Sequence, residues 1–176
     1  PSHPICIGLL VFEEIRENPP ERCYLCKKII MREMKKLARL LGMKAVFDGT
    51  HADDLTKARP GIRALEEEGI ISPFALAGIG KAEIISEAKR LGINAAPPSA
   101  CLATRIPFGT TLTEEPLAKV DAAEGILRDG GVEGILRVRI CGAQAVVETE
   151  TPARQTAKLY ENKLKQLGIE EVSYRD

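Results

Sequence analysis

The longest regular pattern of apolar and polar residues lies between residues 18 and 42 and is typical of one amphipathic helix. Asn18, two prolines and Glu21 form a capping-box sequence with prolines suited to a first helical turn. Gly42 is suited to ending the helix. We therefore expect a helix that runs to about Leu41. Its buried side would carry Leu25 or Cys26, Ile30, Met34, Leu37 and Leu41.

Shorter apolar segments alternate with helical patterns in the following fifty residues. Four segments carry this alternation: apolar runs at 44–48 and 70–74, and helical spacing at 62–68 and 81–91. In the last helix the spacing predicts an inward face made of Ile84, Ile85, Ala88 and Leu91. Strands that alternate with helices in this way indicate an α/β fold with a parallel sheet. We place this first domain at residues 1–112.

The remaining residues, 113–176, predict a small α+β domain. A helix is expected from Thr113 to about Asp129, with Val120, Ala123 and Leu127 inward. Residues 135–141 and 143–148 are typical of two strands that form a hairpin around Gly142. A helix at 152–167 and a last strand at 169–174 complete the pattern.

The composition is that of a globular chain without overall charge. The 176 residues are 44% hydrophobic, and 25 basic residues balance 25 acidic ones. No global field draws in nucleic acid, so we do not expect a nucleic-acid partner. No apolar run is long enough to span a membrane, and no signal-peptide pattern is present, so we expect a cytoplasmic protein. Five cysteines without an export signal favour metal binding or thiol chemistry over a disulfide scaffold.

The loop from Pro98 to Gly109 is the first candidate for chemistry. Cys101 lies there among small residues, four positions before Arg105, and the prolines around it disfavour a long helix. Loops held by regular elements on both sides often present reactive groups. We therefore expect Cys101 to be a functional thiol.

A second cysteine feature, Cys23 and Cys26, falls in the first turns of the long helix, on one face. Such a pair can be redox-active, half of a zinc site, part of an iron–sulfur site, or without a shared role. A thioredoxin-type motif would follow a strand, which is not expected here. Cys101 would complete a three-cysteine site with one open corner. Zinc prefers four ligands, so this set favours a [4Fe–4S] cluster, while zinc and no metal stay open.

Two groups of charged residues are candidates for nucleotide or phosphate binding. Asp48 and Asp53 belong to a loop at the end of an expected strand, where ligands of α/β sheets bind, although a solvated turn explains Asp53 equally well. Arg137 and Arg139 alternate on an expected strand, so they point the same way. They form either a phosphate clamp or a solvent-facing strand edge.

Five stretches carry a resemblance to a known family: residues 18–28 (NPPERCYLCKK), 48–54 (DGTHADD), 59–64 (RPGIRA), 80–84 (GKAEI) and 99–110 (SACLATRIPFGT). Taken in order, they resemble the ATP-dependent sacrificial sulfur transferases of the LarE type, in the PP-loop ATP pyrophosphatase superfamily. The resemblance implies a partial Rossmann-like sheet of the adenine nucleotide alpha hydrolase kind, followed by the small α+β domain.

The resemblance also implies an activity. Members bind ATP and Mg²⁺, adenylate a carboxylate of a pyridinium dicarboxylate mononucleotide, and replace AMP by sulfur on the path to a nickel-pincer nucleotide. Cys101 matches the cysteine that supplies sulfur. In members that also have the C-x-x-C pair, the residues matching Cys23, Cys26 and Cys101 are thought to hold a [4Fe–4S] cluster.

Further residues take roles from the same resemblance. Nucleotide contacts are expected from Asp48, Gly49, Thr50 and Asp53. Substrate contacts are expected from Arg105, Arg137, Arg139 and Glu124.

The family's Ser-Gly-Gly-Val-Asp-Ser loop has no counterpart before Asn18. We therefore expect ATP activation to come from a missing segment or from a separate PP-loop chain, and we expect a homo-oligomer. Two alternatives stay open: a non-catalytic iron–sulfur or nucleotide-binding module that acts with a PP-loop partner, and thiolation of tRNA.

Overall fold

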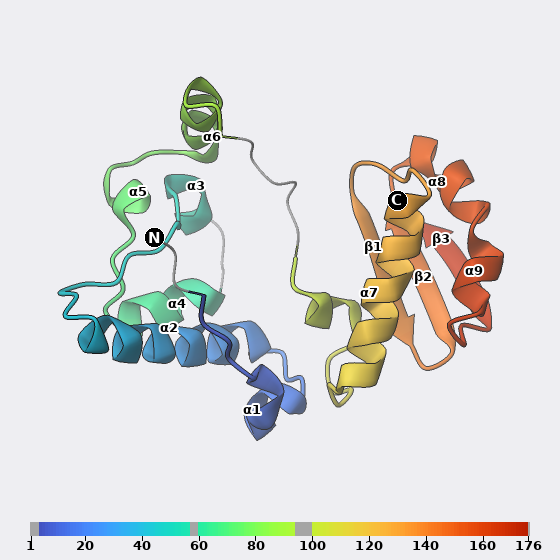
Figure 1. Ribbon diagram of the computed structural model, residues 1–176, viewed down its shortest axis with the longest axis horizontal. Helices are drawn as coiled ribbons and strands as arrows, with labels where there is room; N and C mark the ends of the chain where they lie inside the picture. Colours follow the sequence, from blue (N-terminus) through green and yellow to red (C-terminus); the bar gives the residue numbers. More distant parts are fainter. Residues whose placement is uncertain (1–3, 57–59, 94–99, 176) are drawn as a thin grey trace. The chain divides into compact units, whose positions relative to one another are not determined.

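The computed structural model describes residues 4–56, 60–93 and 100–175, which form two compact units (Figure 1). The first unit comprises Pro1–Ile15 and Pro19–Ala96. The second comprises Arg16–Asn18 and Pro97–Asp176. The loop that carries Cys101 thus groups with the second unit, whereas the sequence placed the end of the first domain at residue 112.

The first unit is built mainly from helices. Its elements are η1 (Leu9–Val11), α1 (Glu13–Arg16), α2 (Arg22–Leu40), α3 (Ala52–Leu55), α4 (Pro60–Glu67), α5 (Pro73–Leu76) and α6 (Lys81–Arg90). The long helix α2 packs against α4. Between them lies a small core in which Ile30, Met34 and Val46 pack against Met31, Leu65 and Ile70.

The two expected strands of this unit meet in the predicted parallel direction, but only at one bridge, between Phe47 and Ile71. The Ile71 amide donates to the Val46 carbonyl (3.1 Å), and the Asp48 amide donates to the Ile71 carbonyl (3.0 Å). Isolated pairs of strands are marginal in water. No other strand pairs with either segment within the described part of this unit, so the ladder does not extend.

The structure corrects the predicted start of one helix and the predicted burial of another. Asn18 is fully buried with a φ of 55° and does not cap α2, which begins at Arg22 after Glu21 with no side-chain cap. The second correction concerns α6, where the sequence predicted an inward face. None of its residues is buried, because no described element packs closely on it.

The second unit contains a three-stranded sheet in the order β1 (Leu136–Cys141), β2 (Gln144–Thr149) and β3 (Glu171–Arg175). β1 and β2 form the predicted antiparallel hairpin, and Gly142 turns between them with a φ of 59°. β3 pairs parallel to β2. The remaining elements are η2 (Leu102–Arg105), α7 (Glu114–Asp129), α8 (Thr151–Lys158) and α9 (Glu161–Lys165), so the expected helix at 152–167 is two helices.

Helix α7 packs on β1 and buries Val120, Ala123 and Leu127, as predicted. The two units differ sharply in how much core they hold. Of the twenty buried hydrophobic residues in the described ranges, fifteen belong to the second unit and five to the first. The described residues form a mixed α/β structure with one small sheet.

Candidate functional site

In the described residues, the Cys101 loop begins at Ala100, and Pro98 and Ser99 lie outside them. Arg59, the first residue of the stretch 59–64, also lies outside the described residues. Cys101 directly precedes the short helix η2, and its side chain is exposed. The Cys101 carbonyl accepts hydrogen bonds from the Thr104 amide (2.9 Å) and from Thr104 Oγ1 (2.7 Å). These bonds close one tight turn behind an outward thiol.

Arg105 holds this turn in place through its buried side chain. Its side chain is 2% exposed, and its Nε and Nη2 atoms donate to Glu124 Oε1 (2.7 Å) and Oε2 (3.3 Å) on α7. Its Nη1 atom donates to Thr104 Oγ1 (2.8 Å) and to the Ala100 carbonyl (3.3 Å). Such a fork-to-carboxylate pair fixes orientation as well as adding energy. The arginine thus bonds residues on both sides of Cys101, the Ala100 carbonyl before it and the Thr104 hydroxyl after it.

The sheet holds the same loop through two further bonds. Glu124 Oε1 also accepts the Val138 amide of β1 (2.9 Å), and Arg139 Nη1 donates to the Thr104 carbonyl (2.8 Å). Arg105 and Glu124, expected to contact substrate, therefore bind each other in the structure. Their contact with a substrate stays a prediction.

Asn18 secures the far end of the loop, a role that the sequence did not indicate. Its Nδ2 atom donates to the Pro107 carbonyl (2.7 Å), and its own carbonyl accepts the Gly109 amide (2.9 Å). A left-handed φ is more accessible to asparagine than to most residues. One signal in the sequence favoured this role, which is that asparagine tolerates a left-handed φ. Asparagine at this position indicated a helix cap equally well.

Three arginines surround the buried carboxylate of Glu148 on β2. Arg139 Nε donates to Glu148 Oε1 (2.6 Å), and Arg175 bonds the same oxygen through Nε (2.9 Å) and Nη2. Arg137 Nη1 lies 3.8 Å from Oε2. Arg137 and Arg139 thus lie on one face of β1, as predicted. Arg175 was missed because its link to Glu148 depends on the pairing of β3 with β2.

The electrostatics of this group favour an anion. Burial opposes the ionisation of Glu148, but hydrogen bonds from Arg139 and Arg175 outweigh it and lower the pKa of the carboxyl below 4.5. One carboxylate then faces three guanidiniums, which leaves two positive charges in excess. All three arginine side chains remain partly exposed. The group can therefore accept a phosphate from solvent while Glu148 orients the donors.

Cys23 and Cys26 lie in the first turns of α2, as predicted. Cys23 is exposed and Cys26 is partly buried, and none of the chain's five cysteines forms a disulfide. In the described residues, no group of three or more His, Cys, Asp or Glu side chains is arranged to hold a metal ion. Cys23 and Cys26 belong to the first unit and Cys101 to the second, so their convergence stays a prediction.

The acidic loop after residue 47 is organised by contacts within the chain. Asp48 accepts hydrogen bonds from Thr50 Oγ1 (2.6 Å), the Thr50 amide (3.2 Å) and Ser72 Oγ (2.6 Å). Burial opposes ionisation of Asp48, but these bonds outweigh it and lower its pKa below 3.8. Asp53 Oδ2 accepts the Lys81 amide (2.7 Å) at the start of α6. The nucleotide roles of Asp48, Gly49, Thr50 and Asp53 stay predictions.

Comparisons with known proteins give three similar relatives. No known family profile matches the chain. It is 42% identical over 144 residues to an uncharacterized protein of Methanocaldococcus jannaschii, covering 82% of this chain and 57% of that protein. It is 38% identical over 140 residues to an uncharacterized protein of Synechocystis, covering 78% and 51%.

A third relative has a stated activity. The chain is 34% identical over 138 residues to the pyridinium-3,5-bisthiocarboxylic acid mononucleotide synthase of Lactiplantibacillus plantarum, covering 77% of this chain and 50% of the synthase. The chain thus spans about half the length of the curated relatives it matches. Across the described residues, no helix has the length and apolarity needed to cross a bilayer.

Proposed function

We propose that this chain carries the sulfur-transfer part of a LarE-type enzyme that makes the thiocarboxylate of a pyridinium mononucleotide. The similarity to the synthase supports the substrate class, since it extends over 77% of the chain. The observation that carries the proposal is the Cys101 loop. An exposed thiol is presented by a turn that a buried arginine–carboxylate pair, an arginine of the sheet and Asn18 all hold in place.

The reaction is a substitution at an activated carboxyl group. Adenylation makes the carboxyl carbon electrophilic. The sulfur held at Cys101 attacks this carbon, a C–S bond forms, and the C–O bond to the phosphate breaks as AMP leaves with the electron pair. Where Cys101 itself is the donor, its Cβ–S bond then breaks and the Cα proton is lost, which leaves dehydroalanine.

We assign the phosphate of the mononucleotide to Arg137 and Arg139, and we add Arg175. The three guanidiniums share Glu148, so its carboxylate keeps them oriented before a ligand arrives. Preorganised donors lose less freedom on binding than mobile ones.

We further propose that Cys23, Cys26 and Cys101 together hold a [4Fe–4S] cluster. Thiolates are the ligands of such clusters, and none of the three cysteines is tied up in a disulfide. Cys23 follows Asn18 by five residues, and Cys101 precedes Pro107, the hydrogen-bond partner of Asn18, by six. Short stretches of chain thus connect the hydrogen-bonded pair of Asn18 and Pro107 to all three cysteines. Such a cluster would carry an additional sulfide as the sulfur donor, so that neither the cluster nor the cysteines would be consumed.

The proposal assigns ATP activation to a PP-loop segment or chain beyond these residues. In it, the first unit forms part of a Rossmann-like sheet, the loop of Asp48, Gly49, Thr50 and Asp53 lies near the nucleotide and Mg²⁺, and the assembled enzyme is a cytoplasmic homo-oligomer. Support for the sheet comes from the parallel bridge between Phe47 and Ile71.

The test bypasses ATP by supplying a chemically prepared adenylate of the pyridinium carboxylate mononucleotide. We expect AMP release and a thiocarboxylate product, both lost in Cys101→Ser and retained in Cys6→Ser. Mass spectrometry of the chain separates the two sulfur sources, because a sacrificed Cys101 becomes dehydroalanine. AMP release without sulfur in the product, or equal product from Cys101→Ser, would contradict the proposal.

A further inference from the structure

The first unit exposes large apolar side chains far more than the second. Of the fifteen exposed large hydrophobic residues in the described ranges, twelve belong to the first unit. Scattered exposed leucines are ordinary, but contiguous apolar surface on a soluble protein usually marks an interaction site. The question is therefore whether these residues gather in one place.

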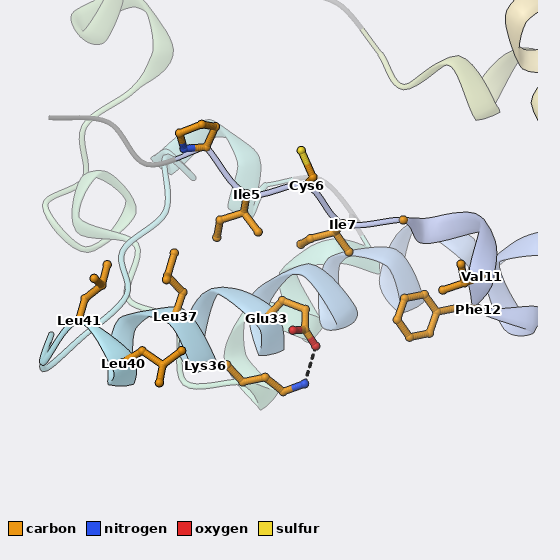
Figure 2. A pocket seen from close by; sticks show the side chains of 12 residues that line it. Ile5, Cys6, Ile7, Val11, Phe12, Glu33, Lys36, Leu37, Leu40 and Leu41 are labelled. Atoms are coloured by element: carbon orange, nitrogen blue, oxygen red, sulfur yellow. Dashed lines mark hydrogen bonds and ion pairs between the residues drawn. The ribbon is translucent and has the colours of Figure 1, made fainter.

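Three of them, Val11, Leu40 and Leu41, line a groove between the N-terminal segment and one face of α2 (Figure 2). The groove has a volume of about 810 Å³. From α2 it takes Glu33, Lys36, Leu37 and Leu40, a spacing that places them on one helical stripe. Glu33, Lys36 and Leu40 lie beside the stripe of Ile30, Met31 and Met34 that the unit's own core uses, and Leu37 lies between the two.

Figure 2 shows how the walls are arranged. Ile5 and Ile7 point toward α2, Leu37 points toward them, and Cys6 points away from the helix. Val11 and Leu40 lie toward opposite ends and are 80% and 84% exposed. The one polar feature drawn is the ion pair between Lys36 and Glu33 (2.6 Å), which is already satisfied. A small-molecule site would need convergent polar groups to orient a ligand, and this groove does not offer them.

A second feature of the first unit favours a polypeptide as the occupant of this groove. Its only ladder in the described residues is the parallel bridge at Phe47, whose side chain is 62% exposed. Parallel sheets occur almost only where both faces are covered, and they rarely stop at two strands. The relatives carry the same matched region within chains about twice as long.

We propose that this groove, lined by residues 4–12 and the Glu33–Leu41 side of α2, is a docking surface for the polypeptide that makes up the unmatched half of the longer relatives. Apolar side chains of that segment fill the space between Ile5, Ile7 and Leu37 and cover Val11 and Leu40. Burying such side chains removes apolar surface from water and so favours the complex. The proposal does not depend on sulfur chemistry.

The test co-expresses the intact chain with the longest stretch of the Methanocaldococcus jannaschii relative that the chain does not match, so that neither partner must fold alone. We expect the two to co-purify. Val11→Asp and Leu40→Asp should each weaken the complex at least about tenfold, because they place a charge in a dry interface. Leu159→Asp is the matched control: Leu159 is 81% exposed but lies in the second unit, and its change should leave affinity within about twofold.

A second readout locates the contact. On complex formation, amide exchange should slow in residues 4–12 and 33–41. Absence of a complex, equal affinity in the groove variants, or protection confined to other residues would overturn the proposal. Self-association of the chain alone that Leu40→Asp abolishes would assign the groove to a second copy and overturn it too. Sulfur transfer from the pre-adenylated substrate needs no partner, so its failure is a separate result.

Discussion

The two units have similar numbers of residues but very different interiors. The second unit buries fifteen hydrophobic residues, eight of them on α7, β1 and β2, and Val120, Leu127, Val138 and Val147 have almost no exposed surface. In the first unit, α2 and α4 enclose a few side chains, and α5 and α6 bury none. The second unit completes its own core, whereas the first leaves more large apolar side chains exposed.

The first test of this comparison is amide exchange on the intact chain, where we expect the largest effect. Local openings span free energies from near zero to the full unfolding free energy. The amides of Val138 and Val147 should exchange at least about a hundredfold more slowly than those of α5 and α6. If α6 were as protected as β2, the contrast between the units would be wrong.

The next effect concerns the pair that fixes the Cys101 loop. Glu124→Ala leaves the Arg105 guanidinium buried without its carboxylate, which should cost about 3–5 kcal/mol in the unfolding free energy of the second unit. Glu124→Gln keeps an acceptor and should cost less. Denaturant unfolding measures both. A loss below 1 kcal/mol in the alanine variant, a limit well under the range for a broken buried pair, would mean that the loop does not rely on this pair.

A matched pair of truncations compares the cores directly. Leu127→Ala removes a fully buried side chain and should cost about 2–5 kcal/mol. Leu40→Ala, at an 84% exposed position, should change stability by no more than about 0.5 kcal/mol. Thermal and urea unfolding of the intact chain give both values. Similar losses in the two variants would show that Leu40 is covered in solution.

The smallest effect is a pH dependence from Glu148. Its pKa is lowered in the folded state, so the stabilisation is present above its ordinary value of 4.5 and is lost as the pH falls through the folded pKa. We expect the unfolding free energy of the wild type to fall below about pH 4.5 more steeply than that of Glu148→Gln. Urea unfolding between pH 7 and pH 3 measures this, and parallel curves would exclude the contribution.

Local patterns predicted the second unit well because its partners are close in sequence. The hairpin around Gly142 and the inward face of α7 at Val120, Ala123 and Leu127 were both correct. The break between α8 and α9 was missed because neither Leu159 nor Tyr160 is a glycine or a proline, the usual helix-breaking residues. Arg175 joined the arginine group through strand pairing, which no local pattern encodes.

Prediction failed where tertiary contacts decide. Asn18 had the sequence of a helix cap, yet it bonds to Pro107, 89 residues away, and this long-range partner determines its conformation. The apolar stripe of α6 predicted burial. Such a stripe shows that a helix can pack against a partner, but it does not show which residues provide that partner. The same limit applies to the cysteines: their spacing gives a ligand set, and their convergence depends on tertiary structure.

The most direct test of the three-cysteine site is the iron and sulfide content of the chain after anaerobic reconstitution. We predict about four iron atoms per chain in the wild type. The cluster should be lost in Cys23→Ser, Cys26→Ser and Cys101→Ser and retained in Cys6→Ser and Cys141→Ser. A cluster that survives the loss of Cys101, or a wild-type chain that binds no iron, would contradict the three-cysteine site.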